Sequence, residues 1–102
     1  MDRLEKMIAD ALLELSSEAQ KIENAQDHQD FFYKYDASFA DDNLNSIDSE
    51  MLLHSLSYYF DFHLIEEQLH EILPWVCEKI DLKCEAICDT EGNVRYYIVY
   101  LF

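Results

Sequence analysis

The apolar residues of this 102-residue chain change their spacing near residue 82. Upstream of that point they recur every three or four residues, which is typical of amphipathic helices. The three segments with this spacing are about 3–25, 48–60 and 63–80. Downstream, two strand-like runs, 82–88 and 94–102, are separated by a loop that carries Gly92, and the second run is rich in β-branched and aromatic residues. The pattern predicts a single α+β domain over 1–102, with three to four helices followed by a C-terminal antiparallel β-hairpin.

Helix boundaries and breaks can be predicted from individual residues. Asp2 is a suitable cap for the first helix, and Ser46 or Asp48 for the helix near 48–60. Residues 26–46 break the earlier spacing, and we expect a short helix or turn around 28–35, followed by a polar loop. Pro74 falls inside the last helical segment, where it predicts a kink or a restart because proline removes a hydrogen bond.

The last strand, 94–102, is apolar on both of its faces. One face can cover the helices, so the other face needs a second cover or a partner. A two-stranded sheet is also marginal unless it is packed or extended. This gives one hypothesis for function: a non-catalytic scaffold or regulatory subunit that assembles through its C-terminal β-strand. Strand 94–102 could add to the sheet of a partner, or to a second copy in a homodimer.

The termini and cysteines indicate a compartment. Residues 1–6 are not followed by a long apolar region, and no run of 18 apolar residues occurs. Three cysteines, an odd number, fit a reducing environment. We therefore expect a cytoplasmic protein.

The charge of the chain limits its partners. Asp and Glu number 22 against seven Lys and Arg, a net charge of −15. Residues 35–78 include ten acids and no Lys or Arg. Nucleic acid and anionic membrane are poor partners for such a chain, because both are bound through basic side chains. Such a charge either keeps the domain soluble or attracts a basic protein. We predict that it attracts a basic protein.

The aromatic residues favour the same interpretation, because protein interfaces are enriched in tyrosine, phenylalanine and tryptophan. Carboxylates pair with Arg and Lys, and aromatic rings accept cations on their faces. The acids predicted to contact a basic partner are Asp36, Asp41, Asp42, Glu66, Glu67 and Glu71. The predicted aromatic anchors are Tyr33, Tyr35 and Tyr58. Residues four apart on a helix lie about 6 Å apart along its axis, so the stripe Asp10, Glu14 and Glu18 could imitate a row of phosphates.

Catalytic and metal-binding patterns are weak. His63, His70, Cys77 and Cys84 recur every seven residues, which places neighbours about 10 Å apart on a helix, too far for one zinc ion. A single glycine excludes a glycine-rich phosphate loop. A reactive cysteine needs an electropositive setting that this chain lacks. We predict no metal site, no cofactor and no enzymatic activity.

The combined profile is short, acidic and rich in aromatic residues. In composition it resembles two groups of inhibitors: immunity proteins that neutralise nuclease toxins, and phage anti-restriction or anti-CRISPR proteins, some of which mimic DNA. This resemblance implies an acidic inhibitor, comparable to an antitoxin, that binds and blocks a basic, nucleic-acid-handling surface of a partner protein. It assigns no individual site residue.

Overall fold

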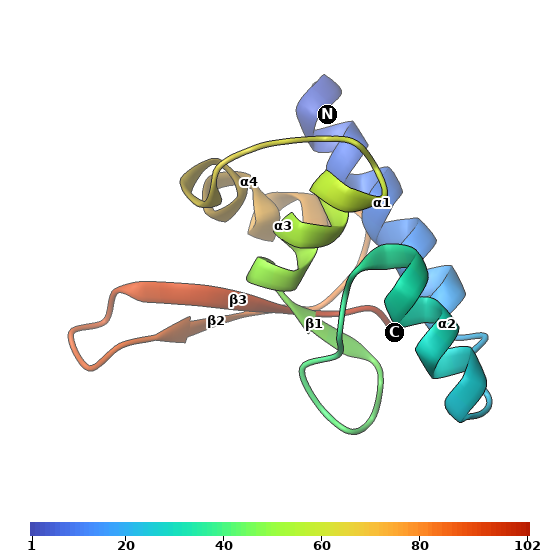
Figure 1. The fold of residues 1–102 in the computed structure, drawn as a ribbon. Coiled ribbons are helices and arrows are strands. Elements are labelled where there is room, and N and C mark those ends of the chain that lie inside the picture. Colours follow the sequence, from blue (N-terminus) through green and yellow to red (C-terminus); the bar gives the residue numbers. More distant parts are fainter.

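A computed structural model describes residues 1–102 and contains four helices and a three-stranded antiparallel sheet (Figure 1). The predicted α+β class is confirmed, and the C-terminal hairpin forms two of the three strands. The elements in chain order are α1 (Arg3–Ala19), α2 (Ala25–Tyr35), β1 (Ser46–Asp48), α3 (Ser49–Tyr58), α4 (Glu66–Lys79), β2 (Cys84–Cys88) and β3 (Val94–Tyr100). No helix combines the length and apolarity needed to cross a membrane.

Helix α1 supplies six of the 18 buried apolar residues of the core. Ile8, Leu12 and Leu15 follow the helical spacing and are fully buried. The predicted cap at Asp2 is confirmed: its side chain accepts a hydrogen bond from the Glu5 amide at 2.8 Å, and the Glu5 carboxylate accepts one from the Asp2 amide at 3.2 Å. This reciprocal pair satisfies two amides that a helix start leaves without partners.

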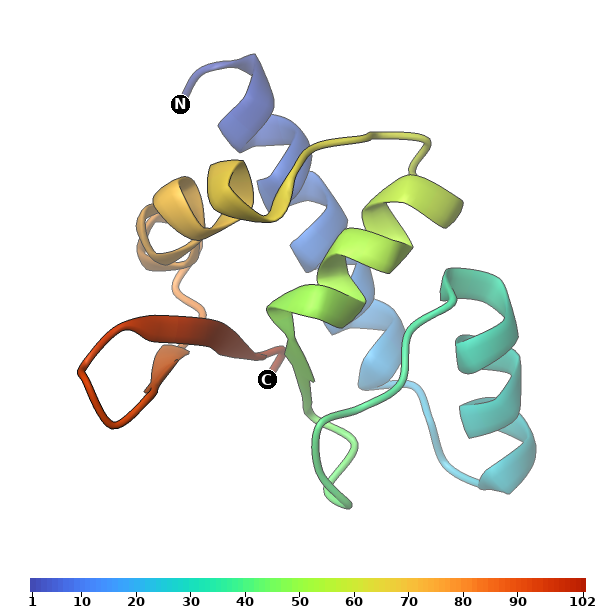
Figure 2. The same ribbon diagram turned by 60° about the vertical axis from the view of Figure 1, so that its left-hand side comes forward.

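Helix α4 packs against α1 and α3, and both α3 and α4 lie on one face of the sheet (Figures 1 and 2). Leu52 and Leu56 of α3 belong to the same core cluster as Leu69 and Leu73 of α4, and all four are fully buried. Each such side chain contributes roughly 2 kcal/mol through removal of apolar surface from water. The packing of these two helices therefore fixes the position of the sheet.

Two predicted helix boundaries were wrong. The segment 3–25 is not one helix: α1 ends at Ala19, and Asn24 then caps α2 by accepting a hydrogen bond from the Asp27 amide at 2.9 Å. The apolar spacing continued past the helix because Ile22 also packs on the core, from the connecting turn. The predicted short helix at 28–35 is the latter part of α2.

The last helix also differs from its prediction. It begins at Glu66 rather than near residue 63, and it runs through Pro74 without a restart. Proline lacks one amide and so removes one helical hydrogen bond. Leu73 and Val76, which flank the proline, are both fully buried and anchor the helix on either side of it.

Strand β1 was not predicted from the sequence. It pairs antiparallel with β3, with Ile47 opposite Val99, so the sheet order is β1-β3-β2. Ser46 therefore lies in a strand, and Asp48 is the cap of α3, accepting from the Met51 amide at 2.8 Å. Strand β3, the assembly surface in the alternative scaffold hypothesis, has a neighbouring strand on each side at Ile98 and Val99. The long open edge of the sheet is β2.

The two faces of the sheet have different surroundings. Ile47 and Val99 point toward the helices and are fully buried. Tyr96, Ile98 and Tyr100 alternate with Val99, so they lie on the opposite face, where they are half-buried. No helix covers the β2–β3 hairpin on that side (Figures 1 and 2).

Ser49 joins three elements at the first turn of α3. Its buried hydroxyl accepts a hydrogen bond from the Tyr97 amide of β3 at 3.0 Å and lies 3.3 Å from Nε2 of His70 in α4. Ser49→Ala leaves the Tyr97 amide without its partner, so we expect the free energy of unfolding to fall by about 1–2 kcal/mol in urea denaturation. The control is Ser57→Ala, which removes a Ser–His contact that is exposed. An equal loss in both variants would contradict this role.

Candidate partner-binding surface

The structure divides the predicted contact residues into two groups. Tyr33 and Asp36 lie on or next to α2, and Asp41 and Asp42 follow in the loop before β1. The remaining acids, Glu66, Glu67 and Glu71, lie on α4. In both views α2 and α4 are on opposite sides of α1 and α3 (Figures 1 and 2). One flat contact with a partner therefore reaches one group and not the other.

The first group belongs to a segment that we call the α2 surface, residues 25–45, comprising α2 and the loop that follows it. Its acids are Asp27, Asp30, Asp36, Asp41 and Asp42, and its only Lys or Arg is Lys34. Helix α2 is held to the core on one side, because Phe31 and Tyr35, one turn apart, are buried. Its other side faces outward.

The loop of the α2 surface is fastened to the helix by an aromatic residue. The ring of Phe39 lies 4.9 Å from that of Phe31 and 5.6 Å from that of His28, measured between centroids. Asp36 ends α2 in the left-handed conformation, with φ of 53°, which turns the chain back along the helix. Asp41 and Asp42 are exposed near the tip of this loop. The loop acids are thus held against α2.

Large aromatic side chains are exposed beside these acids. Phe32 and Tyr33, next to each other on α2, are 42% and 64% exposed, and their ring centroids are 5.8 Å apart. Tyr58, at the end of α3, is also 64% exposed. Its neighbour Tyr59 packs edge-on against Tyr35 at 4.7 Å, which brings the end of α3 to the end of α2. Adjacent exposed rings favour an interface, because aromatic residues are enriched at the centre of protein interfaces.

Tyr35 was predicted as an exposed anchor, and this prediction was wrong. The side chain is 1% exposed, and its hydroxyl donates a hydrogen bond to Oε2 of Glu14 at 2.8 Å. Burial raises the pKa of Tyr35 well above its ordinary value, and the carboxylate of Glu14 raises that pKa further. Glu14 is consequently engaged with Tyr35, and Glu18 is paired with Lys21, so the stripe that began at Asp10 is not a free row of charges.

Tyr35→Phe is expected to lower the free energy of unfolding by about 1–2 kcal/mol at neutral pH, because the half-buried Glu14 loses its donor. The wild type should also lose stability above pH 10, by up to about 1.4 kcal/mol per pH unit from this residue. The unfolded tyrosine releases its proton there, whereas the folded one retains it. Denaturation at several pH values measures both effects.

The variant Tyr35→Phe should show a smaller alkaline loss than the wild type, since it has no phenol to ionise at this position. Tyr33→Phe is the matched control, because Tyr33 lies on the same helix and is exposed. An alkaline profile that is identical in wild type and Tyr35→Phe would contradict the role given to this buried hydroxyl.

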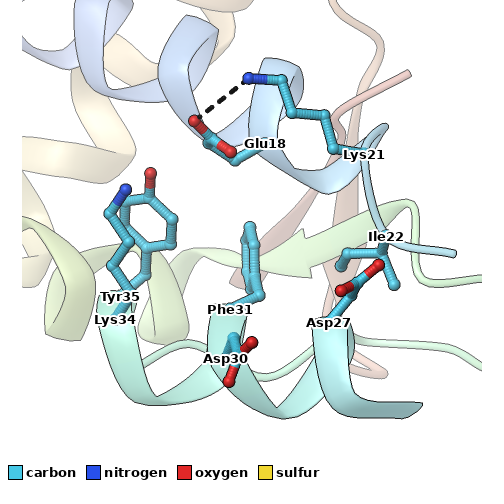
Figure 3. Close-up of a pocket in the computed structure, with 8 residues that line it drawn as sticks. All are labelled: Glu18, Lys21, Ile22, Asp27, Asp30, Phe31, Lys34 and Tyr35. Carbon is cyan, nitrogen blue, oxygen red and sulfur yellow. Dashed lines mark hydrogen bonds and ion pairs between the residues drawn. The ribbon is translucent and has the colours of Figure 1, made fainter. Parts of the chain in front are cut away.

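A pocket of about 210 Å³ lies between the end of α1 and the inner side of α2 (Figure 3). Phe31 stands in its middle and points toward α1, with Tyr35 and Lys34 at one end and Ile22 at the other. The lining residues are Glu18, Lys21, Ile22, Asp27, Asp30, Phe31, Lys34 and Tyr35. Carboxylates around an aromatic ring form a site suited to a guanidinium or ammonium group.

The carboxylates of this pocket retain acceptor capacity. Asp27 accepts from the Glu23 amide through Oδ2 at 3.1 Å, and Asp30 accepts from Gln26 through Oδ1 at 2.8 Å. In each case these bonds use only part of the lone pairs of a carboxylate. Of the lysines, Lys21 is paired with Glu18 at 3.5 Å, and Lys34 lies over the rings of Tyr35 and Tyr59. The site is negative overall and open to solvent on one side.

Sequence reasoning missed Asp27, Asp30 and Phe32. The spacing of the two acids, three residues apart before an aromatic run, was the available signal for one acidic helix face. It was not used because α2 was predicted only as a short helix or turn. The exposure of Phe32 could not be predicted, because the sequence does not show which members of an aromatic run point outward.

The acids on α4 have different surroundings from those on α2. Glu66, Glu67 and Glu71 are exposed, and Oε1 of Glu66 lies 3.8 Å from Nε2 of His70. The one exposed aromatic residue of α4, Trp75, has Lys79 over its ring at 4.3 Å. A partner cation would therefore compete with Lys79 for this ring.

The His and Cys residues noted in the sequence do not converge on one point. His63 contacts Ser57, and His70 contacts Ser49. A hydrogen bond between the Cys77 and Cys84 thiols raises the pKa of the buried Cys77 and lowers that of Cys84. No group of three or more His, Cys, Asp or Glu side chains is arranged to hold a metal ion.

Comparison with protein-family models, curated proteins and solved structures gave no match to the chain. Its function is consequently inferred from the geometry and charge of the surfaces described above.

Proposed function

We propose that this protein is an acidic inhibitor that docks its α2 surface on a basic, nucleic-acid-handling surface of a partner protein and blocks it. The observation that carries the proposal is the exposed pair Phe32 and Tyr33 on a helix whose surroundings are acidic. Aromatic anchors supply binding energy at the centre of an interface, and carboxylates pair with the Lys and Arg of such a partner.

The pocket beside α2 gives the proposal a specific contact. A long basic side chain of the partner can enter between Asp27 and Asp30 and lie against the ring of Phe31. Arginine suits this site better than lysine, because its planar guanidinium can bind carboxylates in a fork and stack on an aromatic ring. We therefore expect the bound surface of the partner to present at least one arginine.

The charge predicts how the complex forms. A net charge of −15 attracts a basic partner over a distance of about 10 Å at ordinary ionic strength, so association is fast and slows as salt rises. The same charge repels nucleic acid and anionic membrane. The inhibitor would thus occupy a groove built for nucleic acid without binding the nucleic acid itself.

The test is a pull-down from the native host at low salt, followed by washes of rising salt and mass spectrometry. We expect a basic nucleic-acid-binding protein or nuclease to be retained and to leave as the salt rises. The purified partner is then titrated with this protein while its binding to a labelled oligonucleotide is followed by fluorescence anisotropy. Retention without any loss of oligonucleotide binding would contradict inhibition, and a partner that resists high salt would contradict the electrostatic mechanism.

A further inference from the structure

The outer edge of β2 carries backbone groups that pair with no other strand. The Tyr100 amide donates to the Lys83 carbonyl at 2.9 Å, and the Asp89 amide donates to the Asn93 carbonyl at 2.9 Å. Lys83 and Asp89, which lie just before and just after β2, therefore direct their backbone groups toward β3. Backbone direction alternates along a strand. Cys84, Ala86 and Cys88 therefore direct their amides and carbonyls outward, where the sheet ends.

The charge of the chain is low around this edge. Residues 1–78 contain 18 acids and four bases, whereas residues 79–102 contain four acids and three bases. The first part has a formal charge of −14 and the second −1. A chain of this charge can approach a copy of itself only where the repulsion is small, and the hairpin is that region. A basic partner, by contrast, is drawn to the other part of the molecule.

We propose that two copies of this chain associate through β2, in antiparallel pairing, to form a six-stranded sheet. If the two antiparallel β2 strands overlap along their full length, Ala86 lies opposite Ala86 of the second copy. Cys84 then lies opposite Cys88, and Glu85 opposite Ile87. The outward backbone groups then meet one another, which satisfies each of them.

The side chains favour this register over its neighbours. In it, Lys83 of each copy lies opposite Asp89 of the other, giving two pairs of opposite charge. Oδ1 of Asp89 accepts from the amides of Glu91 and Asn93, so Oδ2 remains available for Lys83. A shift of two residues would oppose Glu85 to Glu85, or Glu85 to Asp89, and like charges directly opposite are destabilising.

Twofold symmetry explains why the strand that pairs with β2 belongs to a second copy of the chain. The match of Lys83 with Asp89 arises from one strand alone, since the same surface supplies both members of each pair. The interface is also independent of the partner-binding function proposed above, because α2 and the hairpin lie at opposite ends of the molecule (Figures 1 and 2). One proposal can fail while the other holds.

The test uses sedimentation velocity and light scattering of the full chain, in reducing buffer, over a range of protein concentrations. We expect a dimer of twice the 12.1 kDa chain mass, and we expect it to strengthen as salt screens the net repulsion. A chain that stays monomeric at millimolar concentration and high salt would overturn the proposal.

Two variants assign the interface. Ala86→Pro removes an outward amide, which β3 does not use, so the monomer should fold while the dimer dissociation constant rises at least tenfold. Ala86→Thr keeps the amide and should leave the dimer intact. Lys83→Asp changes no backbone group and places a carboxylate opposite Asp89 of the second copy, so it should also weaken the dimer at least tenfold. A dimer unaffected by both Ala86→Pro and Lys83→Asp would overturn the proposal.

Amide hydrogen exchange followed by NMR gives a separate readout. The Cys84 and Ala86 amides should exchange fast in dilute samples and slowly in concentrated ones, whereas the Glu85 and Ile87 amides should be protected in both. A dimer in which the Cys84 and Ala86 amides still exchange fast would place the contact elsewhere, such as on the open face of the sheet, and would refute edge pairing.

Discussion

Reversing Asp41 and Asp42 to lysine should weaken binding of the basic partner by about 100-fold or more. Each substitution replaces an attractive contact with a repulsive one, and 100-fold corresponds to about 2.8 kcal/mol. Both residues are exposed in a loop that Phe39 fastens to α2, so the fold should be unaffected. The dissociation constant is measured by surface plasmon resonance with the partner identified in the pull-down, at two salt concentrations.

Reversal of Glu66 and Glu67 is the matched control for net charge. These two acids are also adjacent and exposed, but they lie on α4, on the other side of the molecule. If the α2 surface forms the contact, this control should slow association only slightly and leave dissociation unchanged. Equal losses in the two double variants would show that net charge alone attracts the partner. A larger loss in the α4 variant would move the interface to α4.

Leu12→Ala should lower the free energy of unfolding by about 3 kcal/mol, the largest stability change expected for a single substitution here. Leu12 lies in the middle of α1 and is fully buried, where it belongs to the apolar cluster shared with α3 and α4. Removal of its branched side chain leaves a cavity that the surrounding helices can only partly close. Guanidinium denaturation measures the change in free energy, and thermal denaturation should show a melting temperature lower by more than about 10 °C.

The neighbouring residue Leu13 provides the control for Leu12→Ala. It has the same side chain on the same helix but is 47% exposed. Leu13→Ala should therefore cost less than about 1 kcal/mol, since it leaves no cavity. Similar losses at both positions would mean that α1 packs on the core through a different face.

The sequence predicted those elements whose side chains repeat regularly. The helical spacing of Ile8, Leu12 and Leu15 located α1, and the strand-like run ending in Phe102 located β3. Strand β1 could not be predicted, because three residues are too few to show the alternation of apolar and polar side chains that marks a strand. It exists because Ile47 fits beside Val99 in the folded sheet. The break between α1 and α2 was hidden for a related reason, since Ile22 continues the apolar spacing from a turn.

The candidate site was predicted less completely than the fold. Asp36, Asp41 and Asp42 are exposed, as expected for acids in a strongly acidic chain. Tyr35 was misjudged, because an amphipathic side chain suits a core with a carboxylate acceptor as well as an interface. The acceptor for its hydroxyl is Glu14, which is 21 residues away in the sequence. Such a long-range hydrogen bond is set by the packing of α1 against α2 rather than by any local pattern.

The positions of α2 and the hairpin, at opposite ends of the molecule, determine the valency of an assembly. A dimer joined through its two hairpins would present its two α2 surfaces at its outer ends, facing away from each other. Such an assembly is bivalent, so binding to a partner that is itself an oligomer gains avidity whenever the spacing of the partner's sites matches that of the two ends. With a monomeric partner, the same geometry sets a stoichiometry of two partner molecules per dimer.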